Sequence, residues 1–378
     1  MRIRVCTGID EVPAADWNDL DAEGNPFLRH EFLAALERND CLGPRFGWLP
    51  HHLICEDEDG RLIGAAPLYL KYNSYGEFVF DWAWADAYAR AGLAYYPKLV
   101  STVPYTPVTG ARLLTAAGRR AQVAPALADA ALAEAQRLEV SGLHWLFTTT
   151  ADEAPLAARG LLARTDCQFH WRNRGYRDFD DFLAVFRAER RKKVRRERRR
   201  VAEAGVEVRV VHGAEVSDAQ WALFHRLYED TFHRHGGPPT LSAAFFREIG
   251  RTLGDRVVLM LAAHGGRDIA AALCLRSDRV LYGRHWGCEE AFNALHFELC
   301  YYQGIDYAIR NGLERFEPGA QGEHKVWRGF EPTATHSMHW LAHPEFRRVI
   351  GRHLERERDG IAYYIHEMRT HSPYKDGY

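Results

Sequence analysis

Two stretches about 200 residues apart resemble each other and suggest that the chain contains one unit twice. Residues 54–70 align without a gap with residues 261–275 and the positions just before them. A second pair of similar segments begins at Gly142 and at Gly312, and each ends a helix-like run and starts a strand-like one. A repeat of this length is a whole domain rather than a solenoid unit. The pattern therefore predicts two similar lobes.

The composition agrees with two lobes of ordinary globular character. A chain of 378 residues with 47% hydrophobic and 26% charged residues can bury two cores. Its formal charge of −2 argues against a general nucleic-acid binder. We predict an N-terminal lobe at residues 1–175 and a C-terminal lobe at residues 176–378.

The order of predicted elements is the same in both lobes. Each begins with a strand and two helices, continues with three meandering strands, and ends with a long helix and one more strand. The long helices are predicted at residues 121–139 and 291–309. Residues 77–82 are predicted to be the third meandering strand of the first lobe, and in the second lobe residues 243–253 are predicted to be a helix and residues 331–341 a further strand. This is the order of the acetyltransferase (GNAT) fold, in which two parallel strands splay apart and leave a cleft for an acyl donor and an amine. The predicted class is α+β, with two tandem GNAT (acyl-CoA N-acyltransferase-like) domains whose mixed, mostly antiparallel sheets are flanked by helices.

The first lobe carries an aromatic insertion. The repeat offset is 206 residues at the hairpins and 170 at the strand after the long helix, so about 36 extra residues lie near 82–118. This segment is rich in aromatic residues and proline, and long connections in compact domains are usually functional or disordered. We predict that it lines a substrate site, with Lys98, Tyr105 and Arg112 holding an anionic acceptor; the alternative is a lid that only packs on the core.

Several chemistries are not supported by motifs. The seven cysteines form no CxxC pair, which favours buried thiols in a reducing compartment. His366 and His371 miss the zincin spacing by one residue, so no metal site is predicted. Nucleotide P-loop, GxGxxG and GxSxG motifs are missing. The N-terminus has no apolar signal region and no apolar run reaches 18 residues, so we expect a cytoplasmic protein.

A strongly basic run leads into the second lobe. Residues 187–200 (RAERRKKVRRERRR) contain ten cations and two glutamates and have a thin apolar edge. We predict a helix in which Arg191, Lys192 and Arg195 bind a phosphate of a substrate or carrier, with a solvated surface as an equal alternative. No pattern for sequence-specific DNA reading accompanies it.

A dense polar cluster follows the strand that should border the cleft of the second lobe. Amide formation needs a base for the amine proton and donors for the oxyanion. Glu317, His324 and Glu323 are the candidate bases, of which Glu317 and His324 are the predicted catalytic residues together with His285 on a neighbouring strand. The remaining polar residues of the loop are predicted to contact substrate or supply main-chain donors: Gly319, Gln321, Glu323, Lys325 and Arg328. The alternative is a polar loop held by ion pairs.

The sequence resembles the bacterial FemAB-like predicted N-acyltransferases. The resemblance rests on residues 95–98, 104–110, 301–303 and 317–330, and it spans nearly the whole chain. That family is related to the peptidoglycan-bridge aminoacyltransferases, which are tandem GNAT-like proteins in which a basic helical segment opens the second domain. This chain has a single short helix in place of a long arm.

The resemblance implies transfer of an acyl or aminoacyl group from an activated ester or thioester to an amine, such as a cell-envelope precursor. The resemblance does not identify the donor; we predict acyl-CoA or aminoacyl-tRNA as the donor and no tightly bound cofactor. Two alternatives stay open: fatty acylation of a lipid-like amine with peripheral membrane contact, and a non-catalytic module that binds polyanions or precursors. The oligomeric state is not predicted.

Overall fold

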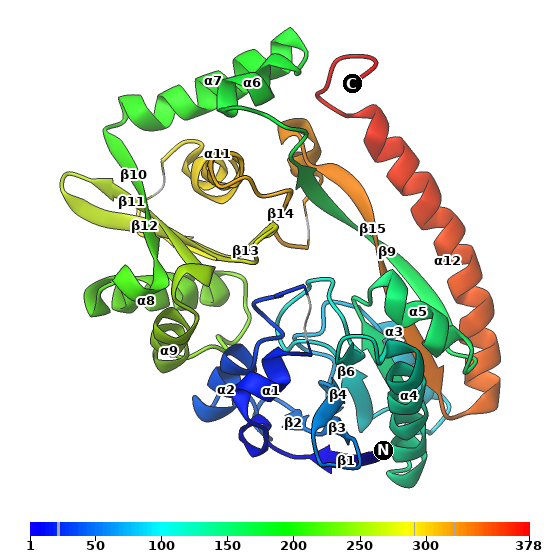
Figure 1. Ribbon diagram of the computed structural model, residues 1–378. Coiled ribbons are helices and arrows are strands. Elements are labelled where there is room, and N and C mark those ends of the chain that lie inside the picture. Colours follow the sequence, from blue (N-terminus) through cyan, green and yellow to red (C-terminus); the bar gives the residue numbers. More distant parts are fainter. Residues whose placement is uncertain (21–22, 291, 321) are drawn as a thin grey trace. The chain divides into compact units, whose positions relative to one another are not determined.

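The computed structural model describes residues 1–20, 23–290, 292–320 and 322–378 and divides into two compact units (Figure 1). Unit 1 comprises Met1–Cys167 and Ala334–Tyr363, and unit 2 comprises Gln168–Thr333 and Tyr364–Tyr378. We predicted a single boundary between the two lobes, after residue 175. The units instead exchange chain segments, because a strand near the C-terminus pairs within unit 1.

Unit 1 contains two groups of strands. Its N-terminal elements are β1 (Arg2–Cys6), η1 (Ile9–Glu11), α1 (Ala14–Asn18), α2 (His30–Arg38), β2 (Trp48–Pro50), β3 (His52–Glu56), β4 (Leu62–Ala66) and β5 (Tyr69–Lys71). These are followed by α3 (Trp82–Arg90), β6 (Lys98–Ser101), β7 (Leu114–Thr115), α4 (Arg120–Arg137), β8 (Gly142–Leu146) and α5 (Thr150–Ala157). The antiparallel order β1-β3-β4-β7 forms one group, and β8-β6-β5-β2 forms the other. Helix α4 packs on β3, β4 and β8 and closes the core.

Two strands and one helix pass from one unit to the other along the chain. Strand β9 (Leu162–Arg172) leaves unit 1 and reaches unit 2, where Trp171 pairs with Phe316. Strand β15 (Glu331–Leu341) leaves unit 2 and pairs with β8 in unit 1, with His339 opposite His144. Helix α12 (Pro344–Thr370) then returns the chain to unit 2. Strand β9 therefore completes the sheet of unit 2, and strand β15 completes the sheet of unit 1.

Unit 2 is built on the strand order β10-β11-β12-β13-β14-β9. Its elements are α6 (Phe179–Ala184), α7 (Ala188–Glu203), β10 (Val206–His212), η2 (Gly213–Glu215), α8 (Asp218–Arg234), α9 (Ala243–Leu253), η3 (Gly254–Arg256), β11 (Val257–His264) and β12 (Arg267–Arg276). The rest are β13 (Val280–Cys288), α10 (Leu295–Phe297), the π-helical turn η4 (Glu298–Tyr302), α11 (Gln303–Arg310), β14 (Arg315–Glu317) and the 3₁₀ helix η5 (Glu323–Arg328).

The sheet of unit 2 is covered on both faces. Helix α11 lies on one face, and α8 and α9 lie on the other (Figure 1). Strand β12 is accordingly buried along nearly its whole length and reads as a continuous apolar run. The β11–β12 hairpin turns at Gly265 and Gly266, both with positive φ, as a tight two-residue turn requires. The structure confirms the predicted GNAT-like class of mixed, mostly antiparallel sheets flanked by helices.

Two predictions about unit 1 were wrong. Residues 77–82 were expected to be a strand, but the strand at this place in the sheet is β6, and residue 82 begins α3. Gly76 and Phe78 both have positive φ, which is incompatible with an extended strand. Strand β9 was missed entirely. Among the residues that the structure describes, no helix is long and apolar enough to span a lipid bilayer.

Packing of Gly304 against β14 gives a prediction about stability. A Cβ atom on Gly304 of α11 would lie 2.4 Å from the ring of buried Phe316, whereas a Cβ on Gly360 of α12 would meet nothing within 4 Å. We expect Gly304→Ala to destabilise the protein by about 1–3 kcal/mol through overpacking. The matched variant Gly360→Ala should stabilise it by about 0.5–1 kcal/mol, because alanine favours a helix. Thermal denaturation checks both; equal melting temperatures for the two variants would contradict the packing.

Candidate active site

Strands β13 and β14 run parallel for three residue pairs only. Val280 pairs with Arg315, and the last pair joins Tyr282 to Glu317, where β14 ends. Strand β13 continues alone on this edge as far as Cys288. The parallel neighbours of unit 2 therefore part in the middle of the sheet, as the predicted fold requires.

A β-bulge lies where the two strands part. Leu273 of β12 pairs with His285 and Cys274 pairs with Gly283, so Arg284 is an extra residue in β13. Bulges bend a strand and are frequent next to active sites. A cavity of about 90 Å³ adjoins the bulge. Residues of β13, of the following helical segment and of the chain after β14 help to line it: His285, Trp286, His296, Cys300, Tyr301 and Pro318.

Tyr301, which lines this cavity, forms a hydrogen-bonded pair with His324. The Tyr301 hydroxyl lies 2.8 Å from His324 Nε2, and the His296 ring packs edge-on against the Tyr301 ring. Burial lowers the pKa of His324 below its ordinary value, and the cations Arg328 and Lys325 lower it further. The imidazole is therefore neutral at pH 7 and can accept a proton. Tyr301 comes from the π-helical turn η4, and such turns often occur at functional sites.

Lys325 is a buried lysine beside this pair. Its Nζ donates a 2.7 Å hydrogen bond to the carbonyl of Gly319, and the residue is only 3% exposed. Burial lowers the pKa of Lys325 to about 7, so its charge changes near neutral pH. Gly319 has φ +99°, a conformation that favours glycine and turns its carbonyl toward the lysine.

Arg328 anchors η5 from within. Its guanidinium binds both carboxylate oxygens of Glu197 on α7 at 3.0 and 3.1 Å, and its Nε donates to the Tyr302 hydroxyl at 3.0 Å. It also donates to the carbonyl of His324 at 2.9 Å and lies 3.5 Å from the Phe297 ring centroid. These contacts anchor η5 from within; that Arg328 contacts substrate stays a prediction.

Glu317 and His324, the two predicted bases, lie on different sides of the sheet. The ring of Phe316 packs against Phe330 in the core beneath α11, and successive strand residues alternate in direction. Glu317 accordingly points to the other side, where His170 of β9 lies 4.0 Å from its Oε2. Burial raises the pKa of Glu317 in spite of Arg315, whose Nε is 2.8 Å from Oε1. Among the described residues, its second oxygen, Oε2, is buried without a hydrogen-bond partner.

His285 is also separated from His324. Its ring packs edge-on against Tyr228 of α8 at 4.9 Å between centroids and lies near Phe232. The next residue, Trp286, instead packs against His296 on the side of His324. Burial and the neighbouring Arg284 lower the pKa of His285 well below its ordinary value. The structure thus pairs His324 with Tyr301, while His285 lines the same cavity as Tyr301 with its ring packed toward α8.

The remaining loop residues have varied positions. Glu323 is exposed and accepts a 2.9 Å hydrogen bond from the Tyr364 hydroxyl. Gln321 lies outside the described residues. On α7, Lys192 is exposed, Arg195 pairs with Asp180 at 2.9 Å, and Arg191 is half-buried near the carbonyl of residue 184. Their assignment to a phosphate stays a prediction.

In unit 1, Lys98 is fully buried at the start of β6. Its Nζ contacts Glu77 at 2.8 Å, Asp81, and the Ser74 hydroxyl at 3.0 Å. Burial acts to lower the pKa of Lys98, but the two carboxylates outweigh it and hold the value above its ordinary range. The positive charge of Lys98 is therefore neutralised by the carboxylates of Glu77 and Asp81 inside the protein.

Tyr105 and Arg112 are likewise buried. The Tyr105 hydroxyl donates to the carbonyl of Cys41 at 2.8 Å. Arg112 donates to the carbonyls of Val108 and Leu146, both at 2.8 Å, and burial lowers its pKa to about 10. These contacts hold main-chain segments of the insertion and of β8 together. That the residues hold an acceptor stays a prediction.

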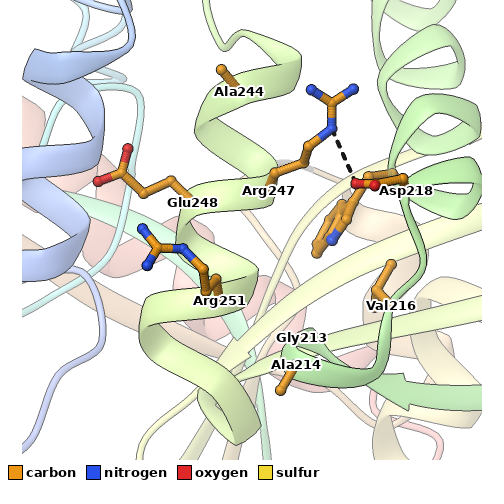
Figure 2. Close-up of a pocket in the computed structure, with 9 residues that line it drawn as sticks. Gly213, Ala214, Val216, Asp218, Ala244, Arg247, Glu248 and Arg251 are labelled. Carbon is orange, nitrogen blue, oxygen red and sulfur yellow. Dashed lines mark ion pairs between the residues drawn. The ribbon is translucent and has the colours of Figure 1, made fainter.

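A second cavity of unit 2 is larger but does not adjoin the parted strands. It has a volume of about 470 Å³ and lies between η2, the start of α8, and α9. Arg247, Glu248 and Arg251 project from α9, and Arg247 points toward Asp218, 3.7 Å away (Figure 2). Acidic and basic groups are balanced here, and no histidine or tyrosine is present for proton transfer. In the part of the chain that the structure describes, no group of side chains could hold a metal ion.

Three side chains at the site were not predicted from sequence: Tyr301, Trp286 and His296. Tyr301 lies within a predicted helix, and a regular helix gave no reason to single it out. The π-helical turn that aims it at His324 has no local sequence signal. Trp286 follows His285 directly, and choosing between them required the position of the bulge.

Comparison with known proteins agrees with this architecture. The crystal structure of FemX is similar with a TM-score of 0.56 at 13% sequence identity, covering 93% of this chain and 100% of that one. The C-terminal domain of a protein assigned as lysylphosphatidylglycerol synthetase from Agrobacterium fabrum gives 0.51 at 11% identity, covering 90% and 94%. L-PGS from Bacillus licheniformis gives 0.50 at 10% identity, covering 87% and 97%. At these identities the likeness concerns the fold alone.

Sequence comparison reaches further than the structural likeness. No curated protein matches the chain. The FemAB-like family, described as acting in peptidoglycan biosynthesis or recognition, matches residues 8–376, which is almost the entire sequence. The parted strands and the His324–Tyr301 pair lie within this match. The chain belongs to the FemAB-like family.

Proposed function

We propose that this protein is an N-acyltransferase of cell-envelope synthesis that moves an acyl or aminoacyl group from an activated ester or thioester to an amine. The observation that carries the proposal is the His324–Tyr301 pair beside the parted strands β13 and β14. The family's description and the FemX-like fold support the same class of reaction.

The reaction assigns a role to each group at the site. The amine nitrogen attacks the acyl carbonyl carbon, and a new C–N bond forms while the carbonyl oxygen gains negative charge. His324 accepts a proton from the attacking nitrogen. The ammonium of Lys325 stabilises the oxyanion. The C–O or C–S bond then breaks, and the leaving oxygen or sulfur takes up the proton from His324 through Tyr301.

The first test concerns His324 and Tyr301. We expect His324→Gln to lower kcat by about 10²–10⁴, the usual contribution of a general base. Tyr301→Phe should cause a smaller loss, because it removes only the hydroxyl that contacts the imidazole. Product formation is measured by intact mass of candidate amines after incubation with acyl-CoAs or aminoacyl-tRNAs.

The matched control is His353→Gln, since His353 is an exposed histidine on α12. It should leave turnover and the melting temperature unchanged. His324→Gln should also keep its melting temperature within a few degrees. If all three variants turned over at the wild-type rate, the base would have to be sought elsewhere.

The second test is the pH profile. The base must be neutral, so kcat/KM should rise as pH increases through the pKa of His324, which lies below 6.5. The Lys325 ammonium is lost as pH rises through its pKa of about 7, so activity should fall above that value. Lys325→Arg keeps a positive charge at all these pH values, and we expect its alkaline decline to disappear. An unchanged alkaline decline in Lys325→Arg would assign that limb to another group.

A second candidate function differs in the acceptor, which would be a lipid-like amine at a membrane surface. The observation that favours it is a group of exposed aromatic side chains in unit 1, which we call the aromatic surface. Its members are Tyr72, Tyr75, Phe78, Phe80 and Trp82, with exposed fractions of 36–66%. Phe78 has φ +59°, which is strained for a bulky residue, and such strain often accompanies function. Aromatic side chains are favoured at lipid headgroups.

Vesicle binding tests the second function. We expect the protein to co-sediment with phosphatidylglycerol vesicles, and Tyr75→Ser combined with Phe80→Ser to weaken this binding about tenfold, because less apolar area would be buried. Tyr363→Ser is the control, since Tyr363 is 70% exposed on α12, away from this segment in sequence. Equal binding by the double variant and the control would exclude the aromatic surface as a membrane contact.

A further inference from the structure

Trp327 is an exposed indole on the segment that carries His324 and Lys325. It lies in η5 and is 39% exposed, whereas its neighbours Val326 and Arg328 are buried. Residues three apart in a 3₁₀ helix lie on the same side, so Trp327 shares a side of η5 with His324. A large aromatic group is therefore exposed next to the proposed base.

Two cations of α7 lie over this indole. Arg190 Cζ is 5.0 Å and Lys193 Nζ is 5.6 Å from the Trp327 ring centroid. Neither cation has an acidic partner among the described residues. The exposed indole is thus combined with positive charge that the protein does not neutralise.

The positive charge continues along one flank of α7. Lys193, Arg196 and Arg200 follow one another at spacings of three and four residues and so share a side of the helix. In the described part of the chain none of the three has an ion-pair partner; Glu189, one turn before Lys193, and Glu203, one turn after Arg200, are the acidic residues on this flank. We call Lys193, Arg196 and Arg200 the basic flank.

The other flank of α7 is different. Arg195 pairs with Asp180 at 2.9 Å, and Arg198 pairs with Glu298 at 3.2 Å. Among the described residues, Arg195 and Arg198 on this flank are therefore neutralised by carboxylates, whereas the cations beside Trp327 have no acidic partner. Because burial of Arg328 against Glu197 fixes η5 on α7, the indole and the basic flank keep a constant position relative to each other.

We propose that Trp327 and the basic flank bind the adenosine and phosphate end of the acyl donor. The adenine base stacks on the indole, and Lys193, Arg196 and Arg200 contact the phosphates. This rests on the proposed transferase function and names the part of the donor that unit 2 recognises. Acyl-CoA and aminoacyl-tRNA share this chemistry, since both carry an adenosine next to phosphate.

Direct binding distinguishes the two sources. The probes are coenzyme A, an acceptor-stem RNA hairpin that ends in CCA, and the same hairpin without its 3′-terminal adenosine. We expect Trp327→Ala to weaken binding of the recognised probe about tenfold, as loss of base–aromatic stacking does. For the RNA, the effect should vanish when the terminal adenosine is removed. Lys193→Gln with Arg196→Gln should reduce the salt dependence of binding.

The controls are Tyr363→Ala, an exposed aromatic on α12, and His353→Gln, an exposed histidine on the same helix, both of which should bind each probe like the wild type. Equal affinities of Trp327→Ala and Tyr363→Ala for both adenosine-containing probes would overturn the proposal, as would no wild-type binding of either probe at millimolar concentration. Trp327-dependent binding without acyl transfer would refute the proposed function alone. Transfer that is equally fast in wild type and Trp327→Ala at low donor concentration would refute this inference alone.

Discussion

The candidate site depends on one buried ion pair, between Arg328 and Glu197. Taking two charges out of water is costly, and such a pair persists only when its hydrogen-bonding groups are satisfied. Here the guanidinium is satisfied by the carboxylate, the Tyr302 hydroxyl and the carbonyl of His324. These contacts join α7, the π-helical turn and η5 in one cluster. The position of His324 opposite Tyr301 follows from this cluster, since one partner is held by Arg328 and the other is adjacent to Tyr302.

The sequence predicted the elements of unit 2 well, and for a physical reason. Helix α9 and strand β15 were predicted with their observed bounds because apolar periodicity and turn residues specify them locally. The exchange of β9 and β15 between the units could not be predicted in this way. The sequence pattern of β15 indicates a strand, whereas the strand at β9 was not recognised. In both cases tertiary packing decides which strand becomes the partner. The same holds for β6, which takes the place that residues 77–82 were expected to fill.

The site was predicted in part. His324, Lys325 and Arg328 were identified because polar groups follow a strand that borders the cleft. Whether each of these residues transfers a proton or anchors the loop depends on its burial and its hydrogen-bond partners, which cannot be read from the sequence. Glu317 was grouped with His324 because the two are close in sequence, but strand alternation after Phe316 sends its carboxylate to the side of His170. Recognising Tyr301 would have required predicting the π-helical turn η4, which has no local sequence signal in this chain.

The buried lysines near the parallel strands of the two units, Lys98 and Lys325, have different hydrogen-bond partners. This difference is the reason for placing the proposed chemistry in unit 2. In unit 1, β6 and β8 pair in parallel, but Lys98 at the start of β6 is closed in by Glu77 and Asp81. An ammonium held by two carboxylates keeps its proton through the physiological range and cannot exchange it during a reaction. In unit 2, Lys325 has a carbonyl as its hydrogen-bond acceptor and a pKa of about 7, so its charge changes near neutral pH. His324 has a hydroxyl as its partner and a lowered pKa, so its imidazole is neutral and can accept a proton. Of these two buried lysines, Lys325 is the one that can release its proton near neutral pH, which is why the proposed chemistry is placed in unit 2.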